Sequence, residues 1–219
     1  MVCWPSDYDG AWTLAGSARR SGIGLHSGHE VAVLLHPWPD AGVWVSWSGD
    51  SEPPVRLQPS QVRDSQLCTT LELGDRRLST VEHLLAALAG CGLTHVHLEV
   101  DGGEVPLLDG SAQGWVEAIA EVGITPAGTP AASRPVLEGP LTLHRGNSLN
   151  PATPADQFTR GGMRDFPQAA IGRQQWTVAL TPERFVAEIA PARTFGFREQ
   201  VEQLRAAGLI QGGALDNAL

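Results

Sequence analysis

The hydrophobic period changes twice within the first half of the chain, and this change constrains the fold most. Apolar residues recur at helical spacing from Val81 to Ala89, and Gly90 ends the pattern. From His95 to Val100 the period is two, so the apolar residues of this segment share one face. A helix followed at once by a strand, after earlier strand-like segments, predicts an α+β chain.

Further strand and helix patterns surround this transition. Trp12 to Ser48 predicts an antiparallel meander, because alternating large residues are bounded by Gly and Pro. Leu67 to Leu73 predicts another strand, followed by a turn at Gly74. Ser111 to Val122 predicts a second helix. Together these elements form a predicted N-terminal α+β domain over residues 1–124.

A linker is predicted over residues 125–135, where three prolines, one glycine and mostly small residues show no apolar period. Residues 136–219 are predicted to form a second α+β domain with a similar order of elements. The predicted strands and helices of the second half lie near 135–143, 175–180, 182–190 and 198–207. The chain ends at Leu219 where apolar residues begin to accumulate, so we expect this second domain to be incomplete.

The charge pattern excludes two classes of partner. The net charge is −9, and all 15 basic residues are scattered arginines. No broad positive field therefore favours a polyanion, so we expect neither nucleic-acid binding nor a polybasic membrane anchor. A single arginine can still bind a phosphate group of a small molecule.

The sequence favours a cytoplasmic protein with no integral membrane segment. Met1 to Gly10 contains two aspartates and no apolar core, unlike a signal peptide. The longest apolar run, Leu84 to Leu93, has ten residues, whereas a membrane span needs about 18. Three widely spaced cysteines favour free thiols in a reducing compartment. No protein partner can be inferred.

Two interpretations of Ser79 to His83 remain open. Ser79 and Glu82 have the spacing of a capping box, in which each side chain binds the other's backbone N–H, and the spacing alone favours this structural role. The functional alternative makes Glu82 a base and His83 a metal ligand at the start of a helix. One histidine does not decide between them.

Other motifs are equally ambiguous. His95 and His97 share a strand face, as ligands do in some metal-dependent hydrolases, but the solvated face of an edge strand is the favoured interpretation. Gly22 to Gly28 lacks the following helix of a dinucleotide site, so it is predicted to be a glycine-rich hairpin carrying His26. Asp109 to Ser111 suits a helix cap. Arg193 to Phe197 suits either a core or an apolar pocket.

In combination, the motifs resemble the UDP-3-O-acyl-N-acetylglucosamine deacetylase family, the zinc enzymes of lipid A synthesis. Six strings occur in the family's order along nearly the whole chain. They are SGIGLHSG (21–28), VRDSQLCTTL (62–71), LSTVEHLLAALAGCGL (78–93), EVPLLDGSAQGWV (104–116), ARTFGF (192–197) and LRAAGLIQGGALDNA (204–218).

The resemblance implies two similar two-layer α/β sandwich domains with the active site packed between them. It also implies one catalytic Zn²⁺ held by two His and one Asp. By motif, His83 matches the first ligand and Glu82 the general base, while His26 matches a nearby histidine without an assigned role. The residues that match substrate-binding positions are Leu67, Cys68 and Thr69 beside the metal, Thr194 and Phe195, and Val201, Ile210 and Gly213 at the start of an acyl-chain passage.

The implied reaction is hydrolysis of the acetamide of UDP-3-O-acyl-N-acetylglucosamine to acetate and a free amine. In the family, the other two zinc ligands lie in a His-Lys-x-x-x-Asp-type segment, and a Ser-Gly-His histidine assists protonation. Neither segment occurs in these 219 residues, so we expect weak zinc binding and negligible turnover by this polypeptide alone. The alternatives are a catalytically dead protein that binds acylated UDP-sugar, a gene fragment, and a metal hydrolase built on His95 and His97.

Overall fold

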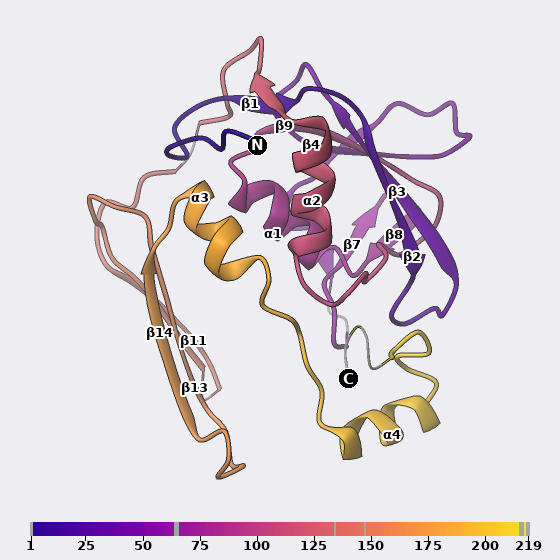
Figure 1. The fold of residues 1–219 in the computed structure, drawn as a ribbon, viewed down its shortest axis with the longest axis vertical. Coiled ribbons are helices and arrows are strands. Elements are labelled where there is room, and N and C mark those ends of the chain that lie inside the picture. The colour runs from indigo at the N-terminus through magenta and orange to yellow at the C-terminus, as the bar shows by residue number, and fades with distance from the viewer. Residues whose placement is uncertain (1, 64–65, 134, 147, 215–216, 218–219) are drawn as a thin grey trace. The chain divides into compact units, whose positions relative to one another are not determined.

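A computed structural model describes residues 2–63, 66–133, 135–146, 148–214 and 217. The chain forms two compact units, one of residues 1–132 and 182–219 and one of residues 133–181. Helices and strands are both present, which confirms the predicted α+β class (Figure 1). Residues 182–219, expected in the second domain, pack with the first unit. The domain boundaries predicted from sequence, 1–124 and 136–219, stay predictions.

A seven-stranded sheet forms the centre of the first unit. Its strand order is β10-β1-β9-β3-β2, with β4 paired to both β9 and β5. The strands are β1 (Trp12–Leu14), β2 (Ala18–Ile23), β3 (Glu30–Pro37), β4 (Gly42–Trp47), β5 (Val55–Arg56), β9 (His95–Val100) and β10 (Ile124–Pro126). Strand β9 pairs antiparallel with β3 and parallel with β4, so it lies inside the sheet rather than at its edge.

The predicted meander is only partly correct. Strands β2 and β3 do form an antiparallel pair. Strand β4, however, pairs in parallel with β9 rather than with β3. The segment Pro37 to Pro39 breaks the chain between β3 and β4, because proline cannot donate to a sheet ladder. The break lets β4 join the far side of β9.

A second, three-stranded sheet precedes the first long helix. It consists of β6 (Val62–Arg63), β7 (Thr70–Leu73) and β8 (Arg76–Ser79), and a 3₁₀ turn at Pro59–Gln61 leads into it. The predicted turn at Gly74 is confirmed, since it joins β7 and β8 with a positive φ of 71°. Strand β7 starts three residues later than predicted, so Leu67 to Thr69 form a loop.

Two helices supply much of the core of the first unit. Helix α1 spans Glu82–Gly90 and helix α2 spans Gln113–Val122, and they lie side by side (Figure 1). Their buried side chains include Leu84 and Leu88 from α1 and Trp115 and Ile119 from α2. These residues stand at helical spacing, and their burial removes apolar surface from water, which stabilises the fold.

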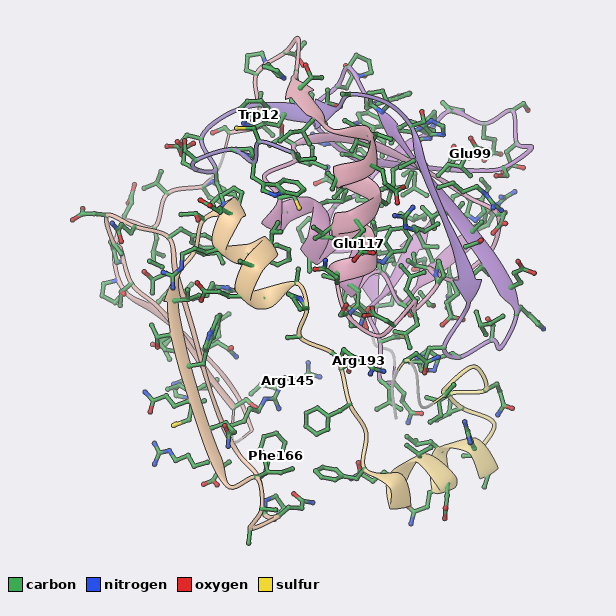
Figure 2. The ribbon with its side chains drawn as sticks, viewed as in Figure 1. Trp12, Glu99, Glu117, Arg145, Phe166 and Arg193 are labelled. Atoms are coloured by element: carbon green, nitrogen blue, oxygen red, sulfur yellow. The ribbon has the colours of Figure 1, made fainter. Side chains whose placement is uncertain are left out.

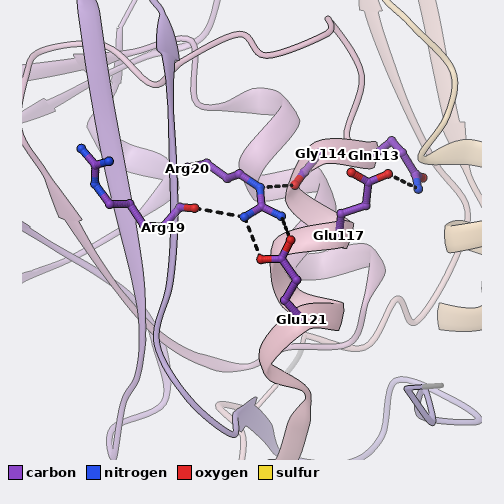
Figure 3. Close-up of polar contacts among 6 residues, drawn as sticks. All are labelled: Arg19, Arg20, Gln113, Gly114, Glu117 and Glu121. Atoms are coloured by element: carbon purple, nitrogen blue, oxygen red, sulfur yellow. Dashed lines mark hydrogen bonds and ion pairs between the residues drawn. The ribbon is translucent and has the colours of Figure 1, made fainter.

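An arginine clamp attaches α2 to the sheet. Arg20 of β2 donates from Nε to the carbonyl of Gly114 at 3.1 Å and pairs with the Glu121 carboxylate at 2.7 Å (Figure 3). On the same helix, Gln113 Nε2 donates to Glu117 Oε1. Arg20 therefore fixes the helix against the edge of the sheet through an ion pair and a hydrogen bond to the helix backbone.

The segment after residue 181 adds two short helices to this unit. Helix α3 (Pro182–Arg184) continues as a π-helical turn over Phe185–Ile189, and α4 spans Arg198–Ala206. The ring of Phe185 lies so close to Gly90 that a Cβ there would collide with it. A glycine at the end of α1 is thus required for this packing.

The second unit consists of two antiparallel pairs in its described residues. These are β11 (Leu141–Arg145) with β12 (Ser148–Ala152), and β13 (Thr159–Asp165) with β14 (Arg173–Ala179). Strands β12 and β13 were not predicted. Every residue of both is exposed, so neither strand shows the alternation of buried and exposed positions that marks a strand in sequence. Figure 2 labels Arg145 on β11 and Phe166 after β13.

Within the described ranges, no helix is both long enough and apolar enough to span a membrane.

Candidate active site

The start of helix α1 carries the two residues with the strongest sequence signal. The Glu82 carboxylate accepts the backbone N–H of Thr69 through Oε2 at 3.0 Å. Ser79 does not take part in a capping box, because its Oγ lies 3.0 Å from Thr70 Oγ1 and its N–H binds the carbonyl of Gly103. The capping-box interpretation is therefore wrong: Glu82 holds the 67–69 loop rather than its own helix end.

His83 follows as a half-buried imidazole on the first turn of α1. Burial lowers its pKa, and the carboxylates of Glu82 and Asp109 raise it in part. It makes no hydrogen bond to another residue that the structure describes. A neutral imidazole with a free ring nitrogen is the form that coordinates a metal ion.

The loop matched to the metal's surroundings lies against Glu82. Thr69 provides the N–H that Glu82 accepts, and Cys68 lies beside it with Sγ 3.7 Å from Thr70 Oγ1. Leu67 has a positive φ of 63° and a side chain that is 57% exposed. A non-glycine residue in this conformation is uncommon, so the turn is held by its surroundings and leaves an apolar side chain facing outward.

Residues 193 and 194 attach the C-terminal segment to the same region. Thr194 donates its N–H to the carbonyl of Gly110 at 2.7 Å. Arg193, labelled in Figure 2, donates to the carbonyl of Asp109 at 2.7 Å and to that of Asn217 at 2.8 Å. Because the Asp109 carboxylate acts on the pKa of His83, these bonds bring Thr194 near the start of α1.

The other predicted substrate-binding residues of the C-terminal segment, those of the acyl-chain passage and Phe195, fall into two groups. Val201 and Ile210 are buried in an apolar cluster with Leu25 and Leu107. Gly213 is also buried and donates its N–H to the carbonyl of Ile210 at 3.0 Å. Phe195 instead is 59% exposed, and its ring meets that of Phe197 edge to face, with the ring centroids 5.8 Å apart. The C-terminal segment thus contains buried residues at Val201, Ile210 and Gly213 and an exposed aromatic ring at Phe195. Of the motif that ends the chain, Leu215, Asp216, Ala218 and Leu219 lie outside the described residues.

The alternative metal site on β9 is not supported. His95 is fully buried, and its ring nitrogens lie 2.8 Å from Thr94 Oγ1 and 3.0 Å from Thr129 Oγ1. His97 Nε2 lies 2.8 Å from Ser46 Oγ. The edge-strand interpretation is also wrong, because β9 has neighbours on both sides. Within the described part of the chain, no three His, Cys, Asp or Glu side chains are grouped as a metal would require.

Asp109 and Glu104 gain a place in this region that sequence patterns did not assign, and they are described here together with His26, which its motif matched to a histidine near the site. Asp109 accepts the N–H and hydroxyl of Ser111 at 3.0 and 2.7 Å, which fixes its carboxylate near His83. Glu104 is buried and binds the loop that contains His26. The ring Nε2 of His26 is buried without a partner among the described residues. In the sequence, the one indication of a buried acid was the position of Glu104 directly before the apolar segment that starts at Val105.

The fold thus combines a Glu-His pair at the start of α1 with a C-terminal segment that is bonded to Asp109, Gly110 and Leu25 of the same unit. The family model "LpxC: UDP-3-O-acyl N-acetylglycosamine deacetylase" matches residues 11–219. The chain is 46% identical to a UDP-3-O-acyl-N-acetylglucosamine deacetylase of Thermosynechococcus vestitus, over 94% of this chain and 72% of the relative. Proteins of the same name from Trichormus variabilis and Anaeromyxobacter sp. are 44% and 41% identical, over 76% and 68% of their lengths.

The chain therefore belongs to the UDP-3-O-acyl-N-acetylglucosamine deacetylase family, as its motifs predicted.

Proposed function

We propose that this protein serves zinc-dependent hydrolysis of the acetamide of UDP-3-O-acyl-N-acetylglucosamine in lipid A biosynthesis, in the cytoplasm. The products are acetate and the free amine, which keeps its O-acyl chain. The observation that carries this proposal is the start of α1, where a half-buried His83 without a hydrogen bond to described residues follows a Glu82 anchored by Thr69. Family membership supplies the substrate.

The donor chemistry of His83 fits one ligand of a zinc ion. Burial keeps its imidazole neutral at pH 7, and its nitrogens are not used by described neighbours. When bound, zinc polarises the amide carbonyl and makes water more acidic. His83 would hold the ion, and Asp109 and Glu82 add negative charge beside the imidazole.

Glu82 is the general base in this proposal. Its Oε2 is occupied by the Thr69 N–H, which fixes the carboxylate and leaves Oε1 to accept a proton from water. The water oxygen then attacks the acetamide carbonyl carbon, and the C–N bond breaks. The proton held at Glu82 passes toward the departing amine, which leaves neutral.

Substrate binding is assigned to the residues matched by motif. Leu67, Cys68 and Thr69 border the reacting amide on the side of Glu82. Thr194 is held near this region by its N–H bond to the carbonyl of Gly110, with Phe195 next to it in the chain, and Val201, Ile210 and Gly213 begin the apolar surface for the acyl chain. An apolar surface is needed because a buried acyl chain contributes about 0.8 kcal/mol per methylene.

The proposal is tested with a chimera. Residues 1–219 are joined to the stretch of the Thermosynechococcus relative that follows its match to this chain, and acetate release from UDP-3-O-acyl-N-acetylglucosamine is measured with and without zinc. We expect zinc-dependent turnover that is lost in His83→Ala and retained in the matched variant His97→Gln.

The 219-residue polypeptide without that stretch is expected to take up zinc weakly and to release no measurable acetate. Turnover that survives His83→Ala in the chimera would overturn the zinc assignment. Tight binding of the acylated UDP-sugar by a chimera without turnover would instead favour a binding protein over an enzyme.

A further inference from the structure

Glu104 is a buried acid that the proposed reaction does not use. Only 5% of the residue is exposed, yet its carboxylate has no cationic partner in the described chain. It accepts hydrogen bonds on both oxygens. Oε1 binds the N–H of His26 and the hydroxyl of Thr80, each at 2.9 Å, and Oε2 binds the N–H of Ser27 at 2.9 Å. A buried carboxylate costs free energy unless such bonds satisfy it.

These bonds join two segments that are distant in sequence. His26 and Ser27 lie in the glycine-rich loop between β2 and β3, whereas Thr80 lies between β8 and α1. A Cβ at Gly24 would collide with the Glu104 carboxylate and the Ser27 hydroxyl, so this loop is shaped around the acid. Gly24 of the motif therefore has a local structural reason.

Thr80 is the residue that turns the chain into α1. It is buried and has a positive φ of 59°, a conformation that is unfavourable for a β-branched residue. Its hydroxyl bond to Glu104 helps to hold that conformation. Glu82 and His83 follow two and three residues later, so the direction in which they leave the turn depends on Thr80.

The same loop also holds the C-terminal segment. The carbonyl of Leu25 accepts the N–H of Gly212 at 2.9 Å, and the side chain of Leu25 packs with Val201 and Ile210. One carboxylate thus orders a loop that contacts the acyl-chain residues and a turn that begins the Glu82–His83 helix.

We propose that Glu104 is a positioning residue of the active site, whose buried carboxylate sets the His26 loop and the Thr80 turn in one fixed arrangement. This inference rests on the proposed function for its consequence in the reaction, but its structural part does not. Burial tends to raise the pKa of Glu104, and the hydrogen bonds from His26, Ser27 and Thr80 outweigh this and lower it. The acid is therefore held ionised, as an acceptor of all these donors.

The test uses Glu104→Gln in the full 219-residue chain, observed by NMR without metal. An amide cannot accept from all these donors, so hydrogen exchange of the His26 and Ser27 N–H groups should rise about tenfold or more, since bonds to charged groups are the strong ones. The imidazole ¹⁵N signals of both His26 and His83 should shift.

Arg20→Gln is the matched control for a general loss of stability, because it also breaks bonds between β2 and a helix (Figure 3). It should lower the thermal midpoint while leaving the His26 and His83 imidazole signals in place. Thr80→Val removes the bond of Glu104 to the Thr80 turn and leaves its bonds to the His26 loop. It should therefore shift the His83 signals and keep the His26 N–H protected. Thr80→Ser, which retains the hydroxyl, should behave as the original chain does.

Unchanged exchange at His26 and Ser27 in Glu104→Gln would overturn the proposal, as would equal imidazole shifts in Arg20→Gln. In the chimera, Glu104→Gln should lower kcat/KM about tenfold, because the bonds it removes order both the Glu82–His83 turn and the loop that contacts the acyl-chain residues. An inactive chimera would count against the proposed function, while the exchange and imidazole data would still decide the role of Glu104.

Discussion

Helix α1 and strand β9 each carry a histidine near their first residue, His83 and His95, but the two imidazoles have opposite surroundings. His95 is fully buried with each ring nitrogen beside a threonine hydroxyl. His83 is half-buried and makes no hydrogen bond to a described residue. A histidine's neighbours, rather than its spacing from another histidine, therefore distinguish a structural imidazole from an available ligand.

The largest effect is expected from removal of the buried imidazole. His95→Ala leaves a cavity at the centre of the sheet and deprives Thr94 and Thr129 of a partner, so the free energy of unfolding should fall by about 3 kcal/mol. Urea denaturation measures this. His83→Ala, at a half-buried position, is the matched control and should lose less than about 1 kcal/mol. Similar losses of unfolding free energy in His95→Ala and His83→Ala would contradict the difference between the two histidines.

A second prediction compares a carboxylate on α1 with a carboxylate on β9. Glu82→Gln keeps the shape of the side chain but cannot take a proton, so kcat of the chimera should fall about 100-fold. Initial rates of acetate release measure it. Glu99→Gln, which changes a carboxylate on β9, should leave the rate unchanged. A Glu82→Gln chimera with normal kcat would show that another group is the base.

The histidines also predict acid sensitivity. Burial is the main cause that lowers the pKa of His83, His95 and His97 below the ordinary 6.5. As pH falls below 6.5, the unfolded chain takes up protons before the folded chain does. The stability present above pH 6.5 is therefore lost toward the lower folded pKa values, by at most about 1.4 kcal/mol per pH unit for each histidine.

Urea midpoints between pH 7.5 and 5 measure this loss. His97→Gln should make the dependence shallower, because that imidazole, which repulsion from His36 also disfavours in its charged form, no longer titrates. A midpoint that is constant over this range would contradict the assigned pKa directions.

The smallest effect is expected from the His97 hydrogen bond. Ser46→Ala removes the hydroxyl 2.8 Å from His97 Nε2 on the partly exposed face of the sheet. The free energy of unfolding should fall by about 0.5–1 kcal/mol. Zinc uptake should not change. A change in zinc uptake would return β9 to consideration as a metal site.

Much of the first unit was predictable because its elements bury one face. The pattern from Val81 to Ala89 predicted α1 within one residue at each end, and β9 matches its predicted bounds of His95 to Val100. In contrast, β12 and β13 are exposed throughout and carry no period. The position of β4 beside β9 depends on long-range pairing, which local patterns do not encode.

The candidate site was predictable only as a set of motifs. Spacing favoured a capping box between Ser79 and Glu82, and only the structure shows that the Glu82 carboxylate goes to Thr69 instead. An acid at the start of a helix has the same sequence pattern whether it caps its own helix or binds a neighbouring loop. The roles of Asp109 and Glu104 depend on contacts across the fold, which the helix-cap pattern at Asp109 and the isolated acid before Val105 did not reveal.

The most direct measurement is a zinc titration of the 219-residue chain followed through the imidazole ¹⁵N signals of each histidine. We expect that the signals of His83 move with added zinc, that those of His95 and His97 stay in place, and that His83→Ala abolishes zinc uptake. Movement of the His95 or His97 signals, or zinc uptake that persists in His83→Ala, would contradict it.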